Sequence, residues 1–319
     1  MQAIVQRRYG APDVLALEEI ARPVPSDGQA LVRVRAASVF FGDHRVLRGS
    51  PFVLRLATGL RRPKQPVPGL DVAGVVEAVG GGVTTLKPGD EVFGWTRGSL
   101  AEYTCAPADQ LVSKPTNLTF AEAASVPETA MTALQGLRDQ GRVEAGQHVL
   151  VIGASGGCGT FAVQLAKAFG AEVTGVCSTR NVELVRSIGA DHVVDYTHEP
   201  VTGLGQRFDV IYQAAGTDSP RRLRRLLTPT GTLVLSNGSG RFAGIDRIIQ
   251  AAVLSPFVRQ RLAVYMTREN HADLLVLRDL LEAGTIRPVI DRTYPLRDAA
   301  EAFRYLEAGH ASGKVVIAV

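Results

Sequence analysis

The sequence predicts an α/β protein in which a parallel sheet, covered by helices on both faces, accompanies a second, β-rich domain. From residue 148 onward strand and helix patterns alternate, which is typical of βαβ units and of a parallel sheet buried on both faces. Residues 1–115 contain short apolar runs separated by Gly, Pro and Asp, as in a barrel-like or folded sheet. The length of 319 residues fits two domains of this kind.

The α/β region repeats a strand–helix pattern. Its predicted strands are 148–152, 172–176, 192–194, 208–212 and 232–235. Its predicted helices are 157–169, 180–188 and 220–227. Just upstream, Thr116 or Thr119 caps a helix that starts FAEAASVP, and the apolar residues of 130–138 have helical spacing.

The remaining elements belong to the two ends of the chain and to one segment of ambiguous pattern. Strands are predicted at 30–34, 72–79, 91–93 and 314–319, and helices at 271–282 and 298–308. Residues 240–268 look helical and apolar, as in a lid, a groove wall or a dimer contact. Because a strand that follows two helices has no place in the completed α/β unit, we expect the last strand to return to the first domain.

Composition excludes several classes of protein. Hydrophobic residues make up 45% and charged residues 21% of the chain, a balance that supports a large core and argues against disorder. Cys105, Cys158 and Cys177 are far apart and form no CxxC pair, so a reducing compartment is expected. We see no signal-peptide pattern and no apolar run of the ~18 residues that a membrane helix needs. We therefore expect a cytoplasmic protein without a membrane partner.

The charge distribution suits an anionic ligand. The formal net charge is +4, which favours a dinucleotide phosphate and is also compatible with nucleic acid. The densest run of cations is Arg221, Arg222, Arg224 and Arg225. We interpret this run as the solvated face of an amphipathic helix, with a polyanion contact as the alternative. Nucleic acid is therefore not the partner that we expect.

A glycine-rich loop carries the strongest functional signal. Residues 153–159, GASGGCG, follow the strand HVLVI directly and open the helix TFAVQLAKAFG, which is the setting of a Rossmann-type dinucleotide site. Gly156 lets the backbone approach a pyrophosphate and Gly159 allows close packing of helix on strand. The helix N-terminus offers free N–H groups and the positive end of its dipole. We therefore predict that Ser155, Gly156, Gly157, Cys158 and Gly159 hold the cofactor, Cys158 as a small apolar filler.

The end of the second strand indicates which dinucleotide binds. NAD sites usually place Asp or Glu there to accept from the ribose 2′-hydroxyl, and the sequence CSTRN has neither. Ser178, Arg180 and Asn181 are instead suited to a 2′-phosphate, Arg180 through charge-assisted bonds. The alternative is that Ser178 merely caps the next helix, and one side chain can serve both purposes. NADPH is therefore the predicted cofactor.

Three ordered segments together resemble the medium-chain dehydrogenase/reductase superfamily, in its zinc-independent quinone oxidoreductase-like branch. They are PVPGLDVAGVVEAVGGGVTTLKPGDEVFG at 66–94, VIGASGGCGTFAVQLAKAFGA at 151–171 and AGTIRPVIDRTYPLRDAAEAFRYLEAGHASGKVVIAV at 283–319. The resemblance implies a GroES-like catalytic domain from residues 1–119 and 263–319, a Rossmann NADPH-binding domain at 120–262, and a cleft where the two meet. It also implies dimers or tetramers built through the Rossmann sheet, of which we expect a homodimer.

The resemblance extends the predicted cofactor site. It implies that Thr132 contacts the nicotinamide end and that Ala215 and Gly216 lie beside the adenine or ribose. Further residues that it implies are Tyr196 near the 2′-phosphate, Ser236 and Asn237 facing the nicotinamide, and Lys314 near the cleft.

The expected zinc ligands are missing. Relatives in the zinc branch carry a Cys and a Gly-His-Glu triplet, where this chain has Phe40 and the triplet Gly69-Leu70-Asp71. Only Cys105 occurs where a structural-zinc lobe would lie. Asp43 and His44 are adjacent, and on a strand adjacent side chains point to opposite faces. We therefore expect no metal.

A reductase without a Lewis acid favours acceptors that delocalise the incoming charge. The predicted reaction is hydride transfer from NADPH to a quinone or an α,β-unsaturated carbonyl compound, a small-molecule substrate. The alternatives are an aldehyde or other carbonyl reductase, and a non-catalytic NADPH-binding protein. Candidate walls of the substrate pocket are Phe40, Phe41, Trp95 and Tyr265. Relatives often have Asn-Pro in place of Phe40-Phe41, so this pair departs from the family pattern. The residues leave the catalytic proton donor open, with Asp43 and Tyr265 as weak candidates beside solvent.

Overall fold

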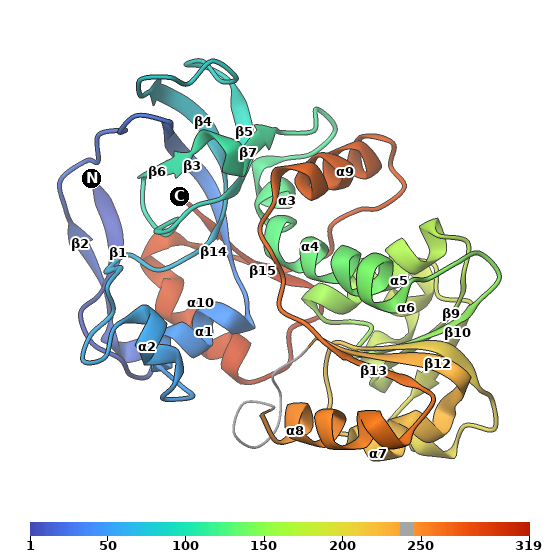
Figure 1. Cartoon of the computed structure of the whole chain (residues 1–319). Coiled ribbons are helices and arrows are strands. Elements are labelled where there is room, and N and C mark those ends of the chain that lie inside the picture. Colours follow the sequence, from blue (N-terminus) through green and yellow to red (C-terminus); the bar gives the residue numbers. More distant parts are fainter. Residues whose placement is uncertain (237–244) are drawn as a thin grey trace. The chain divides into compact units, whose positions relative to one another are not determined.

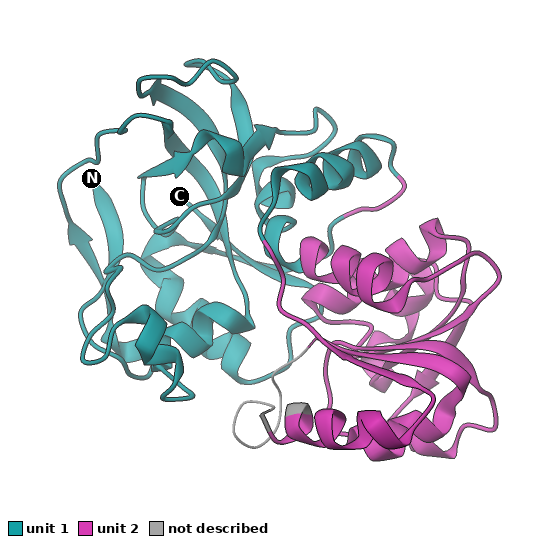
Figure 2. Ribbon diagram, in the orientation of Figure 1, with its two compact units in different colours: residues 1–129, 269–284, 288–319 teal, residues 130–268, 285–287 magenta. Residues whose placement is uncertain are grey.

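The computed structural model describes residues 1–236 and 245–319. The chain divides into two compact units, drawn in different colours in Figure 2. Unit 1 consists of Met1–Thr129, Glu269–Gly284 and Pro288–Val319, and unit 2 of Ala130–Arg268 and Thr285–Arg287. Both chain ends therefore belong to unit 1, and the predicted α/β class is confirmed. None of the described helices has the length and apolar character that crossing a membrane requires.

Unit 1 is built on an extensively antiparallel sheet. Its strands lie in the order β14-β15-β3-β4-β5-β7, with β6 also paired to β3. Their bounds are β3 Gln29–Val39, β4 Asp71–Val79, β5 Glu91–Trp95, β6 Tyr103–Pro107, β7 Leu111–Ser113, β14 Ile290–Pro295 and β15 Lys314–Ala318. A separate antiparallel pair is β1 Gln2–Gln6 with β2 Leu15–Glu19. The long β3 lies inside the sheet, where it pairs with β15, β4 and β6. Its Ala30, Val32 and Val34, at every second position, pack into the core.

The C-terminal strand joins the sheet formed by the N-terminal region, as predicted. β15 pairs antiparallel with β3, placing Val316 opposite Ser38. β14, which the sequence analysis did not predict, runs parallel to β15 at the edge of the sheet. Its IDRTYP sequence is only partly buried, so it lacked a continuous apolar run that could have marked a strand.

The helices of unit 1 include two that the sequence analysis did not predict, at residues 41–48 and 54–58. The helices of this unit are α1 Phe41–Arg48, α2 Leu54–Thr58, α3 Phe120–Ala124, α9 His271–Glu282 and α10 Ala299–Glu307. We had placed Asp43 and His44 on a strand, which is wrong, because β3 ends at Val39 and α1 begins two residues later. Asp43 accepts from the Phe40 N–H at 3.1 Å, and this bond in the first turn starts the helix. Thr119, rather than Thr116, caps α3 through a capping box with Glu122.

Unit 2 contains a parallel sheet with helices on both faces (Figure 1). Among the described residues the strand order is β10-β9-β8-β11-β12-β13, and every pairing is parallel. The strands are β8 His148–Ile152, β9 Glu172–Cys177, β10 His192–Asp195, β11 Phe208–Gln213, β12 Leu227–Leu235 and β13 Arg261–Val264. The order reverses between β8 and β11, which is where ligands bind in open α/β sheets.

The helices of unit 2 pack on this sheet by their apolar faces. They are α5 Gly157–Ala168, α6 Val182–Ser187, α7 Pro220–Leu223 and α8 Ile245–Leu254. α4 Pro127–Gln135 leads from unit 1 into a π-helical turn at Gly136–Gly141. Leu223 of α7 and Ala251 of α8 are buried against Leu150 and Ile211 of the sheet. One face of the sheet is thereby closed by residues far apart in the sequence.

Two predicted helices in unit 2 have different bounds in the structure. The helix expected at 220–227 ends at Leu223, followed by a short 3-10 turn, and β12 already begins at Leu227. The helical prediction for 240–268 is wrong beyond α8, because Arg261–Val264 forms β13. A four-residue strand has no periodicity of its own, and its pairing with β12 decides its conformation.

Candidate functional site

The glycine-rich loop lies between the end of β8 and the start of α5. The N–H groups of Gly153 and Ala154 both donate to the carbonyl of Val176 at the end of β9, at 3.1 and 2.9 Å. Gly159 faces the loop so closely that a Cβ there would lie 1.9 Å from the Gly153 carbonyl oxygen. Packing of the helix onto the loop therefore requires glycine at 159.

Gly156 has no such structural reason to be glycine. Its φ of −83° is accessible to any residue, and an added Cβ would meet only the Gly153 carbonyl oxygen, at 3.6 Å. The missing side chain leaves space beside the N-terminus of α5. That helix has no side-chain cap at Gly156 and no acidic residue in its first turn. Such a position fits a pyrophosphate, which needs close approach to the backbone and free N–H groups.

The residues predicted to select NADPH lie at the ends of two neighbouring strands. β9 ends at Cys177 and β10 at Asp195, paired in parallel register. Arg180 is exposed just beyond β9, and Tyr196, 58% exposed, follows β10. Ser178 is half-buried beside them. A cation, a hydroxyl and an aromatic ring at one edge suit a phosphate on a ribose.

Asn181 links the two parts of this site. Its side chain is buried, at 6% exposure. Its amide Nδ2 donates to the Ser155 hydroxyl at 3.0 Å and to the Ser178 hydroxyl at 3.4 Å. The side chain thus ties the glycine loop to the end of β9. This contact orients Ser155 and Ser178, which the sequence analysis did not foresee.

The remaining predicted cofactor residues of unit 2 follow β11 and β12 at the same edge. Ala215 lies where the chain leaves β11, and its N–H donates to the Ile152 carbonyl at 3.1 Å. The Gly216 carbonyl accepts from Arg247 at 3.2 Å. Ser236 follows β12 and donates from its hydroxyl to the Gln213 carbonyl at 3.1 Å. Asn237 lies outside the described residues.

Thr132 and Tyr265 are brought together within unit 2. The Tyr265 hydroxyl donates to the Thr132 carbonyl, and the Thr132 hydroxyl lies 2.6 Å from the Thr267 hydroxyl. The Tyr212 hydroxyl lies 3.5 Å from that of Tyr265. Burial raises the pKa of Tyr212, so this hydroxyl stays protonated. The contacts with the Thr132 carbonyl and the Tyr212 hydroxyl give the Tyr265 side chain a fixed position, and the Thr132 carbonyl accepts its hydroxyl proton.

Unit 1 holds a buried ion pair that the sequence analysis missed. The Lys314 ammonium lies 3.1 Å from Asp71 Oδ2, and the two side chains are 2% and 0% exposed. Asp71 also accepts from the Ser38 hydroxyl at 2.8 Å and from the Glu128 N–H at 3.0 Å. The charge of Lys314, which the resemblance placed near the cleft, is therefore neutralised within unit 1. An Asp inside the apolar run LDVAGVV and a Lys at the start of KVVIAV were the available signals.

Asp43 lies beside this ion pair. It is 6% exposed. Burial, reinforced by the negative charge of Asp71, raises the pKa of Asp43 well above its usual range, against the Phe40 N–H and Lys314, which lower it. The Lys314 ammonium lies 5.7 Å from the centre of the Phe40 ring. Burial beside Asp71 therefore favours the protonated form of the Asp43 carboxyl.

The predicted aromatic walls have contrasting environments. Phe41 is 46% exposed, whereas Trp95 is 1% exposed, and Phe40 is half-buried. Trp95 lies on β5 opposite Asp71 in register. Its indole Nε1 is buried without a hydrogen-bond partner in the described part of the chain. A buried hydrogen-bond donor without a partner destabilises the folded state, and such donors are rare in native proteins.

The donor set of the described residues does not fit a catalytic metal. No group of three or more His, Cys, Asp or Glu side chains in 1–236 and 245–319 is placed to hold an ion. His44 instead contacts Glu307 at 2.6 Å, and Asp43 accepts from the Phe40 N–H. The adjacent residues Asp43 and His44 thus have separate partners.

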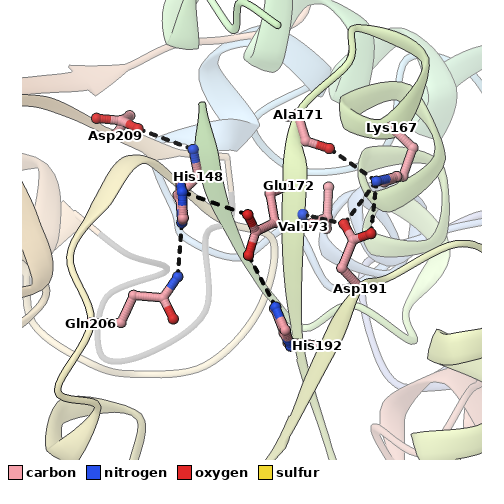
Figure 3. A network of polar contacts seen from close by, with 9 residues as sticks. All are labelled: His148, Lys167, Ala171, Glu172, Val173, Asp191, His192, Gln206 and Asp209. Carbon is pink, nitrogen blue, oxygen red and sulfur yellow. Dashed lines mark hydrogen bonds and ion pairs between the residues drawn. The ribbon is translucent and has the colours of Figure 1, made fainter. Parts of the chain in front are cut away.

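At the other ends of the same strands, where β8, β9 and β10 begin, a network of polar side chains takes the place of the glycine-rich loop (Figure 3). Glu172, at the start of β9, contacts His148 at 3.6 Å and His192 at 3.0 Å. Asp191 contacts the Lys167 ammonium at 2.8 Å and accepts from the Val173 N–H at 2.7 Å. These charged side chains therefore pair with one another at the amino-terminal ends of the strands.

Two family models match the chain. The alcohol dehydrogenase GroES-like domain matches residues 26–116, and the zinc-binding dehydrogenase domain matches residues 188–317. The first match lies within unit 1 and confirms that its β-rich part is GroES-like.

Named relatives and a solved structure are similar over nearly the whole chain. A 2-methylene-furan-3-one reductase from Solanum lycopersicum is 37% identical over 99% of this chain and 79% of its own length. The NADPH-dependent alkenal/one oxidoreductase of Arabidopsis thaliana chloroplasts is 36% identical, with the same coverage. The quinone oxidoreductase structure from Coxiella burnetii has a TM-score of 0.88 and 31% identity, covering 100% of this chain and 99% of its own.

Proposed function

Since the chain belongs to the medium-chain dehydrogenase/reductase superfamily, in its quinone oxidoreductase-like branch, we propose that it reduces a quinone or an α,β-unsaturated carbonyl compound with NADPH. Relatives that cover nearly all of it are named for enone, alkenal and quinone reduction. The observation in this chain that carries the proposal is Gly156, whose missing side chain leaves the N-terminus of α5 open where neither packing nor backbone requires glycine.

The cofactor, when bound, supplies the hydride. Ser155, Gly156, Gly157 and Cys158 hold the pyrophosphate at the N-terminus of α5, and Gly159 keeps that helix close to β8. Further roles are those that the family resemblance and the strand ends imply. Ser178, Arg180 and Tyr196 would hold the 2′-phosphate, and Asn181 would help to position them. Ala215 and Gly216 would flank the adenosine, Thr132, Ser236 and Asn237 would lie at the nicotinamide end, and Lys314 would lie near the cleft.

We propose that catalysis proceeds without zinc. Phe40 and Leu70 stand where the zinc branch has ligands, and the donors that remain nearby have other partners. Without a metal to polarise a carbonyl, the acceptor must delocalise charge itself, as quinones and enones do. Phe40, Phe41, Trp95 and Tyr265 are the proposed pocket walls.

The proton that completes the reduction has two proposed donors. Asp43 is kept protonated by burial, and Tyr265 is fixed by its bond to the Thr132 carbonyl. We further propose a homodimer in which residues 1–119 and 263–319 form the GroES-like catalytic domain and residues 120–262 form the Rossmann NADPH-binding domain. The three separated cysteines support a reducing, cytoplasmic setting.

The test is NADPH oxidation by the purified, EDTA-treated protein with a naphthoquinone, a short enone, an enal and a simple aldehyde, and with NADH in parallel. Turnover of the quinone or the enone with NADPH, unchanged by EDTA, is the expected result. Turnover of the aldehyde alone would favour the carbonyl reductase alternative. Tight NADPH binding without turnover of any acceptor would overturn the proposed reaction.

A further inference from the structure

One segment of unit 1 is strongly basic. Residues 44–70 contain six cationic side chains and no Asp or Glu. The cations are Arg45, Arg48, Arg55, Arg61, Arg62 and Lys64. Arg61, Arg62 and Lys64 are exposed. Arg48 pairs with Glu307 of α10 at 2.6 Å, so the positive charge of this surface comes mainly from the exposed Arg61, Arg62 and Lys64.

The same segment exposes large apolar side chains. Phe52 is 68% exposed, Val53 56%, Leu56 65% and Leu60 57%. We call Phe52, Val53, Leu56 and Leu60, with the cations Arg61, Arg62 and Lys64, the α2 patch. Single exposed hydrophobic residues are ordinary on a protein surface, whereas four within nine residues form a cluster that calls for an explanation.

The backbone of α2 fixes the direction of this cluster. Val53 already has helical dihedral angles, so Phe52 and Leu56, four residues apart, lie on one face of the turn. The other face is tied to the protein. The Tyr9 hydroxyl lies 2.8 Å from the Thr58 hydroxyl and donates to the Gly59 carbonyl at 2.6 Å, and Arg55 donates to the Gly49 carbonyl at 3.0 Å. The helix, labelled α2 in Figure 1, thus has its apolar side chains exposed.

We propose that the α2 patch binds the surface of an anionic lipid bilayer. Aliphatic and aromatic side chains enter the boundary between headgroups and acyl chains, while flanking Arg and Lys reach the phosphates. Charge complementarity selects this occupant, because the exposed cations Arg61, Arg62 and Lys64, in a stretch 44–70 that has no Asp or Glu of its own, match a negative membrane surface. The surface contact needs no membrane-spanning helix, and it is independent of the reaction proposed above.

The first test is co-sedimentation with vesicles of phosphatidylcholine alone or mixed with phosphatidylserine. We expect the protein to sediment with the mixed vesicles and to be released by high salt. The double variant Phe52→Ser/Leu56→Ser should lose at least about 10-fold in affinity, since two inserted side chains are removed. The control is Phe257→Ser in unit 2, at a phenylalanine that is 83% exposed, more than Phe52. Equal loss in the control, or no sedimentation of the wild type, would overturn the proposal.

The second test changes the charge instead of the apolar face. Arg61→Gln/Arg62→Gln should weaken binding to the phosphatidylserine vesicles and flatten its salt dependence. Arg221→Gln/Arg222→Gln removes two equally charged, exposed side chains of unit 2 and should leave both unchanged. If the two pairs have the same effect, net charge alone drives the association and the patch is not a site. Thermal unfolding of every variant shows whether the fold is retained.

A fluorescent reporter locates the contact. Because Trp95 is the single tryptophan of the chain and is buried, Phe52→Trp adds one exposed indole. Its emission should shift to the blue on phosphatidylserine vesicles and be quenched by brominated lipid, whereas Phe257→Trp should do neither. A Phe52→Trp emission that responds to a quinone or enone substrate and not to vesicles would assign the segment to the substrate pocket and overturn the proposal.

Discussion

The strands of the parallel sheet in unit 2 have different surroundings at their two ends. We call the side where they begin the amino-terminal edge and the side where they finish the carboxyl-terminal edge. At the amino-terminal edge, Glu172 pairs with His148 and His192, and Asp191 with Lys167 (Figure 3). At the carboxyl-terminal edge the chain places glycines and small hydroxyl residues beside a helix N-terminus without a side-chain cap.

The difference shows what makes one edge a candidate site. Charged side chains at strand ends satisfy one another and close that edge, which then contributes a small amount of stability. Glycines at strand ends leave main-chain N–H groups accessible, and a ligand can then satisfy them. Substitutions at the two edges should therefore separate effects on stability from effects on cofactor affinity.

The largest expected effect is that of Gly159→Ala. The new Cβ would lie 1.9 Å from the Gly153 carbonyl oxygen, so α5 must move away from its loop. We expect a loss of about 3 kcal/mol or more in unfolding free energy, which is a fall of about 6 °C or more in Tm. Thermal unfolding followed by circular dichroism measures it. An unchanged Tm would mean that α5 does not pack so closely on the Gly153 carbonyl oxygen at Gly159.

Gly156→Val should act on binding without acting on the fold. The space beside Gly156 holds only one protein atom near the new side chain, so Tm should stay within about 2 °C. The side chain would occupy the place of the pyrophosphate, and we expect both NADPH and NADH to lose about 100-fold or more in affinity, or roughly 2.7 kcal/mol. Isothermal titration with each cofactor checks this. Retained affinity would show that the loop does not hold the cofactor.

Arg180→Ala should distinguish the two cofactors. Only NADPH has a 2′-phosphate, and loss of a charge-assisted bond to it costs about 1.5–3 kcal/mol, or roughly 10- to 100-fold in Kd. NADH affinity should change by less than about twofold. Arg221→Ala, another exposed arginine of unit 2, is the control. Equal losses for both cofactors would contradict the role given to Arg180.

The smallest effect is expected at the closed edge. Burial raises the pKa of Asp191, but the bonds from Lys167 and the Val173 N–H outweigh it and hold that pKa below its usual range. A carboxyl whose pKa is lowered by folding stabilises the protein above the unfolded pKa and loses this contribution as the pH falls through the folded pKa. Asp191→Asn should therefore cost about 1 kcal/mol or less near neutral pH, because the pair is partly exposed.

The pH dependence of Asp191→Asn is the check. The stability difference between wild type and variant, measured by urea unfolding, should shrink below about pH 4, and NADPH affinity should be unchanged throughout. A large loss of NADPH affinity would mean that the cofactor binds at the amino-terminal ends of the strands, which would contradict the proposed site.

The sequence alone determined the α/β class, the glycine loop and its place between strand and helix. These features depend on local patterns: an apolar strand, glycines at fixed spacing from Gly153 to Gly159, and apolar residues at helical spacing. The return of the last strand to the first domain followed from connectivity. The departure at Ser178 and Arg180 from an NAD pattern is likewise readable residue by residue.

Only the tertiary structure decided the features that join distant residues. The ion pair of Asp71 and Lys314 connects positions 243 residues apart, and no local pattern encodes such a pairing. The short β13 exists because it pairs with β12, and α1 begins where the Asp43 side chain accepts from the Phe40 N–H. The raised pKa of Asp43 depends on burial beside Asp71. Burial, register and long-range charge arise only when the chain is folded, and therefore they could not be predicted from the order of its residues.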